Sequence, residues 1–126
     1  MGTNQPYENE PESDDDFLVK ETVELDHNPG GDSYDSWNID SDTHSRIKAR
    51  AISRTGEHIR LVVVEEDEFE FFEEGTDYWY ESQTSWGTSV NLEERFSTEG
   101  NHVLVVLAKN VEGNNGAEVT VEAWEF

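Results

Sequence analysis

The sequence predicts an all-β fold, a jelly-roll-like antiparallel β-sandwich of seven to eight strands. Short segments rich in β-branched and aromatic residues follow one another along the chain. Clusters of Gly, Pro, Asn, Asp and Ser, which favour turns, separate them. Almost no segment has the 3.6-residue periodicity of an amphipathic helix, which favours strands throughout.

The start of the chain differs from the rest. Residues 1–16 contain two prolines, three consecutive aspartates and only two large apolar residues, Met1 and Tyr7. Such a segment buries too little surface to offset its loss of conformational entropy on ordering. We therefore predict a disordered acidic leader or tether at 1–16 and one β-sandwich domain at 17–126.

Four strands are expected in the first half of the domain. Residues 19–25 are β-prone, and residues 33–40 alternate apolar and polar side chains after a turn-rich segment. Residues 46–52 alternate apolar with cationic side chains, as in a half-buried antiparallel strand. Residues 54–57 predict a hairpin turn. It leads into residues 59–64, whose continuous apolar run indicates a central strand.

The second half begins with an ambiguous segment. Residues 65–74 are acidic and carry Phe69, Phe71 and Phe72, a spacing that fits a strand or one helical turn equally well. Residues 89–92 alternate as a strand, and residues 118–123 alternate in a last strand that ends at Trp124 and Phe126. The apolar run 103–108 predicts a buried central strand. The polar region 78–91 is less regular, so we expect an edge strand or a long exposed loop there.

Charge is the strongest feature of the composition. The chain has 30 acidic and 8 basic residues, a formal net charge of -22, and the acids are spread along its length. Self-repulsion opposes folding at ordinary salt, whereas at molar salt the Debye length falls to about 3 Å. This pattern predicts a salt-adapted protein of haloarchaeal type; an acidic protein that binds cations or basic partners is the alternative. Without a cluster of basic residues, nucleic acid and anionic membranes are not expected partners.

A family resemblance rests on two parts of the chain. The first is the series 89–92, Glu99-Gly100-Asn101-His102, 103–106, Asn110 and 117–121; the second is the aromatic-polar element 34–39. Together, over about 33–124, they resemble GOLD-type and bacterial prepeptidase C-terminal-type β-sandwiches. The Gly-x-Tyr usual in that family is Gly-Asn-His here. The resemblance implies a non-catalytic binding or accessory role, outside the cell or at its surface.

Catalytic and metal motifs are not found in the sequence. His27, His44, His58 and His102 lie in no metal-binding spacing, no Gly-x-Ser-x-Gly elbow is present, and there is no cysteine. Asp40, Asp42 and His44 would share one side of an extended segment. They lack the glycine and distal glutamate of a calcium loop, and a solvated turn explains them better. We expect no catalytic residues, no cofactor and no metal site.

Aromatic side chains make the best binding candidate. They are Tyr78, Trp79, Tyr80 and Trp86, and Gln83 and Asn91 add hydrogen-bonding groups near them. Exposed rings of this kind stack on sugars or fill pockets of a protein partner. The alternative is that the rings fill a core that has few aliphatic residues.

These observations favour a non-catalytic, salt-adapted binding or interaction module, extracellular or at the cell surface, with a protein or carbohydrate partner. The alternative is a cytosolic structural or regulatory partner protein, and a carbohydrate-active or other hydrolytic enzyme is a more distant third. Residues 1–4 have neither the basic nor the apolar region of a signal peptide, although removal of a signal or lipid anchor would leave the same start.

Overall fold

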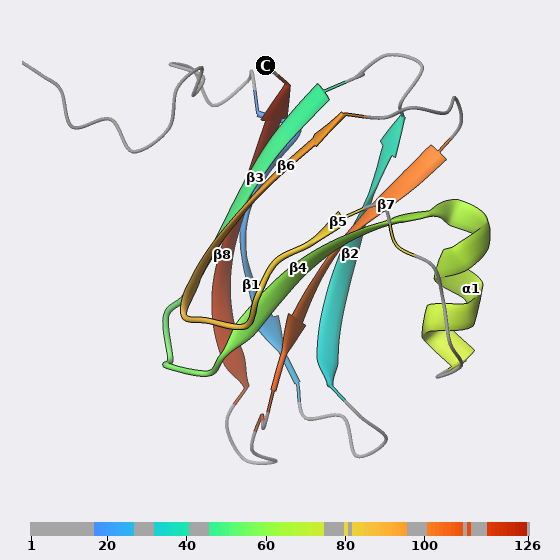
Figure 1. The fold of residues 1–126 in the computed structure, drawn as a ribbon. Helices are drawn as coiled ribbons and strands as arrows, with labels where there is room; N and C mark the ends of the chain where they lie inside the picture. Colours follow the sequence, from blue (N-terminus) through green and yellow to red (C-terminus); the bar gives the residue numbers. More distant parts are fainter. Residues whose placement is uncertain are drawn as a thin grey trace, which may run out of the picture.

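The computed structural model describes residues 17–26, 32–40, 46–74, 80, 82–95, 101–109, 111 and 116–125. These ranges contain eight β-strands and one helix (Figure 1). The elements are β1 (Val19–Leu25), β2 (Ser33–Asp40), β3 (Arg46–Ser53), β4 (Ile59–Glu65), α1 (Glu66–Glu74), β5 (Ser82–Gln83), β6 (Ser89–Arg95), β7 (Asn101–Ala108) and β8 (Ala117–Glu125).

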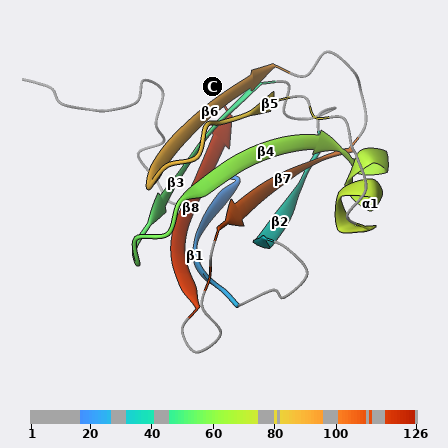
Figure 2. The same ribbon diagram turned by 60° about the horizontal axis from the view of Figure 1, so that its bottom comes forward.

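The strands form two antiparallel four-stranded sheets packed face to face (Figures 1 and 2). One sheet, called sheet A, has the order β1-β8-β3-β6, and sheet B has the order β2-β7-β4-β5. The first strand pairs with the last, the second with the seventh, the third with the sixth and the fourth with the fifth. This nested pairing is that of one long hairpin rolled into two sheets, which is the jelly roll. The predicted fold class is confirmed.

The hairpin predicted at residues 54–57 is wrong. β3 pairs with β6 and β8 in sheet A, whereas β4 pairs with β5 and β7 in sheet B. The turn therefore carries the chain from one sheet to the other. Its Gly56 has φ 96°, a left-handed conformation that glycine adopts without strain, and the Gly56 N–H donates to Ser53 Oγ at 3.1 Å.

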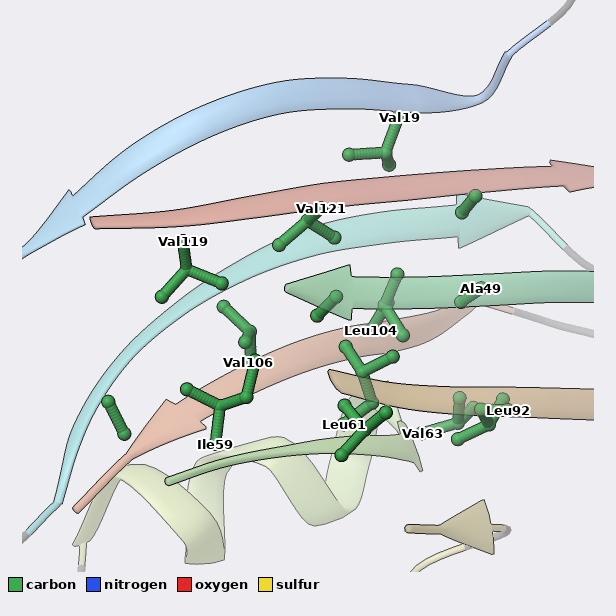
Figure 3. Close-up of a cluster of buried hydrophobic side chains, with 14 of the residues drawn as sticks. Val19, Ala49, Ile59, Leu61, Val63, Leu92, Leu104, Val106, Val119 and Val121 are labelled. Atoms are coloured by element: carbon green, nitrogen blue, oxygen red, sulfur yellow. The ribbon is translucent and has the colours of Figure 1, made fainter. Parts of the chain in front are cut away.

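The core lies between the two sheets and is almost entirely aliphatic. Figure 3 shows Val119, Val121 and Ala49 of sheet A facing Leu61 and Leu104 of sheet B. Strand alternation sends every second residue of each strand into this layer. At the open side of the sandwich, Trp37 Nε1 of β2 donates to Glu21 Oε2 of β1 at 2.6 Å, which ties the two edge strands together.

Sheet B also has an apolar outer face, which explains why its central strands are continuous apolar runs. The outward side chains form a second buried cluster. Its buried members are Val62, Val64, Val103, Val105 and Leu107. Tyr34, Phe69, Phe72 and Trp86 cover them. Because β4 and β7 are buried on both faces, the predictions of central strands at 59–64 and 103–108 are confirmed.

Helix α1 resolves the ambiguous acidic segment. It lies against sheet B on the side away from sheet A (Figure 1). Phe69 and Phe72 are one helical turn apart, so both rings face the sheet, while Phe71 is 46% exposed. Three acids in the first turn, Glu66, Asp67 and Glu68, interact favourably with the positive end of the helix dipole.

Several expectations lie outside the described residues. They include the leader at 1–16, the turns within 27–31 and 41–45, and residues 96–100. In the described part of the chain, no helix has the length and hydropathy needed to span a membrane.

Candidate functional site

The six candidate binding residues are not all brought together. Tyr78 and Trp79 lie outside the described residues. Tyr80 is 49% exposed, Gln83 ends β5, and Trp86 lies partly buried beside the outer face of sheet B. An edge strand is expected within 78–91. The described part of that region confirms it, because β5 is an edge strand of sheet B.

Asn91 does not belong with the others. It lies in β6 between the inward-facing Val90 and Leu92, so its side chain points outward from sheet A. Gln83 is paired with Val62 of the second cluster and therefore faces outward from sheet B. The two side chains lie on opposite faces of the sandwich, because alternation along each strand fixes the side from which it projects.

Trp86 is held in place by backbone pairing of its neighbours with β4. Ile59 N–H donates to the Gly87 carbonyl at 2.8 Å, and Gly87 N–H returns a bond to the Ile59 carbonyl at 3.0 Å. Thr84 N–H donates to the Leu61 carbonyl at 2.9 Å. The segment is thus fixed on both sides of Trp86, and its ring packs on the second cluster.

Two cations contact the Trp86 ring. Arg60 Cζ lies 4.7 Å and Lys109 Nζ lies 4.2 Å from the ring centroid. Arg60 Nη1 also donates to Gln83 Oε1 at 3.5 Å. Each cation–π contact contributes about 0.5–2 kcal/mol, depending on its exposure. We call Arg60, Gln83, Trp86 and Lys109 the Trp86 site.

Strand geometry places both cations there. Arg60 is directly opposite Leu107 in the β4–β7 pairing, so it faces outward. Lys109 is two residues after Leu107 and continues on the same side, with its N–H bonded to the His58 carbonyl at 3.0 Å. Two of the eight basic residues of a chain of net charge -22 therefore meet on one tryptophan.

The chemistry available at the site is hydrogen-bond donation to an anion. The arginine guanidinium offers donors in a planar fork that matches a carboxylate, and the lysine ammonium adds a point charge. Arg60 and Lys109 are both partly exposed. A ligand carboxylate at this face would meet two donors held by one ring.

Arg60 and Lys109 are not among the site residues predicted from the sequence. A signal was present, because each is a rare basic residue inside or directly after one of the two most apolar strands. A cation in such a run faces the outer side of a sheet and marks where that side opens to solvent. Their meeting at Trp86 depends on pairing between segments that are far apart in the chain.

The four histidines do not form a common site in the part of the chain that the structure describes. His58 is exposed, His102 is buried at the start of β7, and His27 and His44 lie outside the described residues. In the ranges that the structure describes, no group of three or more His, Asp or Glu side chains is arranged to hold a metal ion. Asp42 lies outside those ranges, so the Asp40–Asp42–His44 set is not tested.

No protein-family model matches this chain, and no curated protein matches it. Among solved structures, it is similar to the pre-peptidase C-terminal domain of a collagenase from Bacillus anthracis, at 14% sequence identity and a TM-score of 0.47. The match covers 82% of this chain and 87% of that domain. That domain is of one of the two kinds named from the sequence resemblance, while a GOLD-type relationship and a haloarchaeal origin stay predictions.

Proposed function

We propose that this chain is a non-catalytic interaction module that binds an acidic segment of a protein partner at the Trp86 site. The observation that supports the proposal is the pair of cations, Arg60 and Lys109, held on one partly exposed tryptophan in a chain of net charge -22. Arginine and tryptophan are also the side chains that contribute most often to the energy of protein interfaces.

Charge favours this face for an acidic partner. Most of the surface repels other acidic proteins, and like charges placed across an interface cost several kcal/mol. The Trp86 site lowers that repulsion locally and offers donors to carboxylates.

A protein carboxylate fits better than a neutral sugar. A sugar would stack on an open aromatic face, whereas Arg60 and Lys109 already contact the Trp86 ring. The same two groups are suitable donors for an acidic side chain. Salt adaptation and an extracellular or cell-surface location belong to the proposal as well; the high acid content supports the first and the prepeptidase-type resemblance the second.

The test is an NMR titration of the full chain with blocked oligoglutamate, and with oligoglutamine of equal length as the control. It is run at the lowest salt that keeps the chain folded. The proposal predicts shifts of the Arg60, Gln83 and Lys109 amides and of the Trp86 indole N–H, with oligoglutamate only. An equal response to oligoglutamine, or no response at these groups, would contradict it.

A further inference from the structure

The outer face of sheet A has a charge opposite to that of the whole chain. Among the described residues, strand alternation places six of the eight basic side chains there, together with four acidic ones. The basic residues are Lys20, Arg46, Lys48, Arg50, Arg54 and Arg95. The acidic residues are Glu24, Glu93, Glu118 and Glu122. We call these ten side chains the basic face, and it is net positive in a chain of net charge -22.

Ion pairs cross the strands of this face. Arg50 Nε lies 2.6 Å from Glu122 Oε1, and Lys20 Nζ lies 3.8 Å from Glu122 Oε2 on the other side. Lys48 Nζ lies 3.9 Å from Glu93 Oε1. Glu122 therefore sits between two cations, and among the described side chains of the face the basic ones outnumber the acidic ones.

The centre of the basic face is buried although it points away from the core. Trp124 has no exposed surface, and the Arg50 side chain is only 13% exposed. The Phe17 ring packs edge-on against Trp124 at 5.7 Å, and the Arg50 guanidinium lies 5.3 Å from the Trp124 ring. Phe17, the first residue that the structure describes, thus covers part of this face by packing on Trp124.

Residues 1–16 attach at that point. Lys20 Nζ lies 4.5 Å from the Phe17 ring, and Leu18 N–H donates to the Ala123 carbonyl at 2.8 Å, so the start of β1 is fixed on the face. Directly before Phe17 stand Asp14, Asp15 and Asp16. The segment 1–16 carries six carboxylates and no Lys or Arg.

Segment 1–16 is long enough to reach the basic face. Strands in a sheet are about 4.8 Å apart, so β3 lies roughly 10 Å from β1 in the order β1-β8-β3. An extended residue spans at most about 3.5 Å, so three residues reach β3 and the full segment reaches beyond β6. Contact by charge requires no fold within the segment, which fits its composition.

We infer that the basic face is the docking surface for the chain's own acidic segment 1–16. The six carboxylates of the segment are attracted to the basic side chains of this face, and the segment continues the cover that Phe17 begins over Trp124. An acidic partner from outside would then meet an occupied basic face, which leaves the Trp86 site on sheet B available. The inference concerns sheet A and does not depend on the proposed function.

The experiment uses the full chain with a nitroxide at Gln5→Cys, a unique label because the chain has no cysteine. We expect selective loss of amide signal in β3 and β8, at Lys48 and Glu122, compared with Val105 of β7. The loss should decrease as KCl is raised, because screening weakens exposed ion pairs. It should also decrease in Arg46→Gln/Lys48→Gln but not in the matched control Arg60→Gln/Lys109→Gln, which removes two charges from the Trp86 site.

Several results would overturn the inference. They are an even signal loss over both sheets, a loss centred on sheet B, and a selective loss that neither salt nor the double variant reduces. A mixture of labelled, NMR-silent chains with unlabelled, NMR-visible chains identifies contact between molecules. Signal loss of the full size in that mixture would show that a second copy, rather than the chain's own segment, occupies the face.

Discussion

Tyr34 joins helix α1 to sheet B through both its ring and its hydroxyl. The ring lies edge-on to Phe72 at 4.9 Å and to Phe69 at 6.3 Å. The hydroxyl donates to Glu73 Oε2 at 3.2 Å. Burial raises the pKa of the Tyr34 phenol above 10.0, and the charge of Glu73 and its hydrogen bond raise it further.

This arrangement predicts an alkaline weakening of α1 docking. Since the folded pKa lies above the unfolded value of 10.0, the contribution of Tyr34 is complete below about pH 10 and is lost as pH rises through the folded pKa. Tyrosinate absorbance should show one late-titrating group that Tyr34→Phe removes. Glu73→Gln should lower this pKa only in part, because burial, the largest single cause, remains. A late group that persists in Tyr34→Phe would refute the assignment.

At the residue scale, the sequence predicts alternation but not long-range neighbours. The alternation in 46–52 correctly predicts Ile47, Ala49 and Ala51 as buried. The same reasoning cannot predict that Arg60 and Lys109 meet Trp86, because that contact requires the pairing of β4 with β7 and of Gly87 with Ile59. The direction of a side chain depends on the alternation within its own strand, whereas the make-up of a site depends on how several strands pair.

At the element scale, α1 shows why the acidic segment 65–74 was ambiguous. The spacing of its phenylalanines fits the period of a strand and that of a helix, so which of the two forms depends on what the rings pack against. The outer face of sheet B offers Val62, Val64 and Val105, which a helix at this position covers. A helix this short is marginal in water without such tertiary packing.

The adjacent Phe72 and Phe71 provide a matched pair for this account. Phe72→Ala should cost about 2 kcal/mol, less than for a fully buried ring because Phe72 is partly exposed. Phe71→Ala should change the free energy of unfolding by no more than about 0.5 kcal/mol, since Phe71 is 46% exposed. Denaturant unfolding measures both, and equal losses would show that α1 does not dock as described.

The wrong hairpin at 54–57 has a physical reason too. Turn residues determine that the chain reverses, but not which sheet the next strand joins. Here the β4 strand is apolar on both faces, and such a strand is stable only in the interior of a sheet covered on both sides. Sheet B provides that position between β7 and β5.

At the scale of the whole molecule, charge is distributed unevenly. Six basic residues lie on the outer face of sheet A and two at the Trp86 site, whereas the 30 acids are spread along the chain. Composition could predict the excess of acid but not this segregation of the cations, which follows from strand alternation and sheet order together. The result is a strongly acidic molecule with two places that suit a carboxylate.

Stability should therefore depend on salt. Screening reduces the repulsion among the acids, so the thermal midpoint in far-UV CD should rise steeply from low salt to molar KCl. Each kcal/mol gained raises the midpoint of a domain of this size by roughly 4 °C. A midpoint that does not change with KCl would remove salt adaptation from the account.

Recognition at the Trp86 site is tested most directly by the affinity of labelled oligoglutamate for three full-length chains, measured by fluorescence anisotropy. They are the unmodified chain, Arg60→Gln/Lys109→Gln, and the control Asn38→Asp/Ser89→Asp, which changes the net charge by the same amount at exposed residues outside the Trp86 site and the basic face. Losing two charge-assisted contacts should weaken binding by about tenfold or more in the first variant, since 1.4 kcal/mol is tenfold. The control should bind within about a factor of two of the unmodified chain. Equal weakening in both variants would show that the change in net charge, rather than loss of contacts at Trp86, lowers the affinity, and would contradict a recognition site at Trp86.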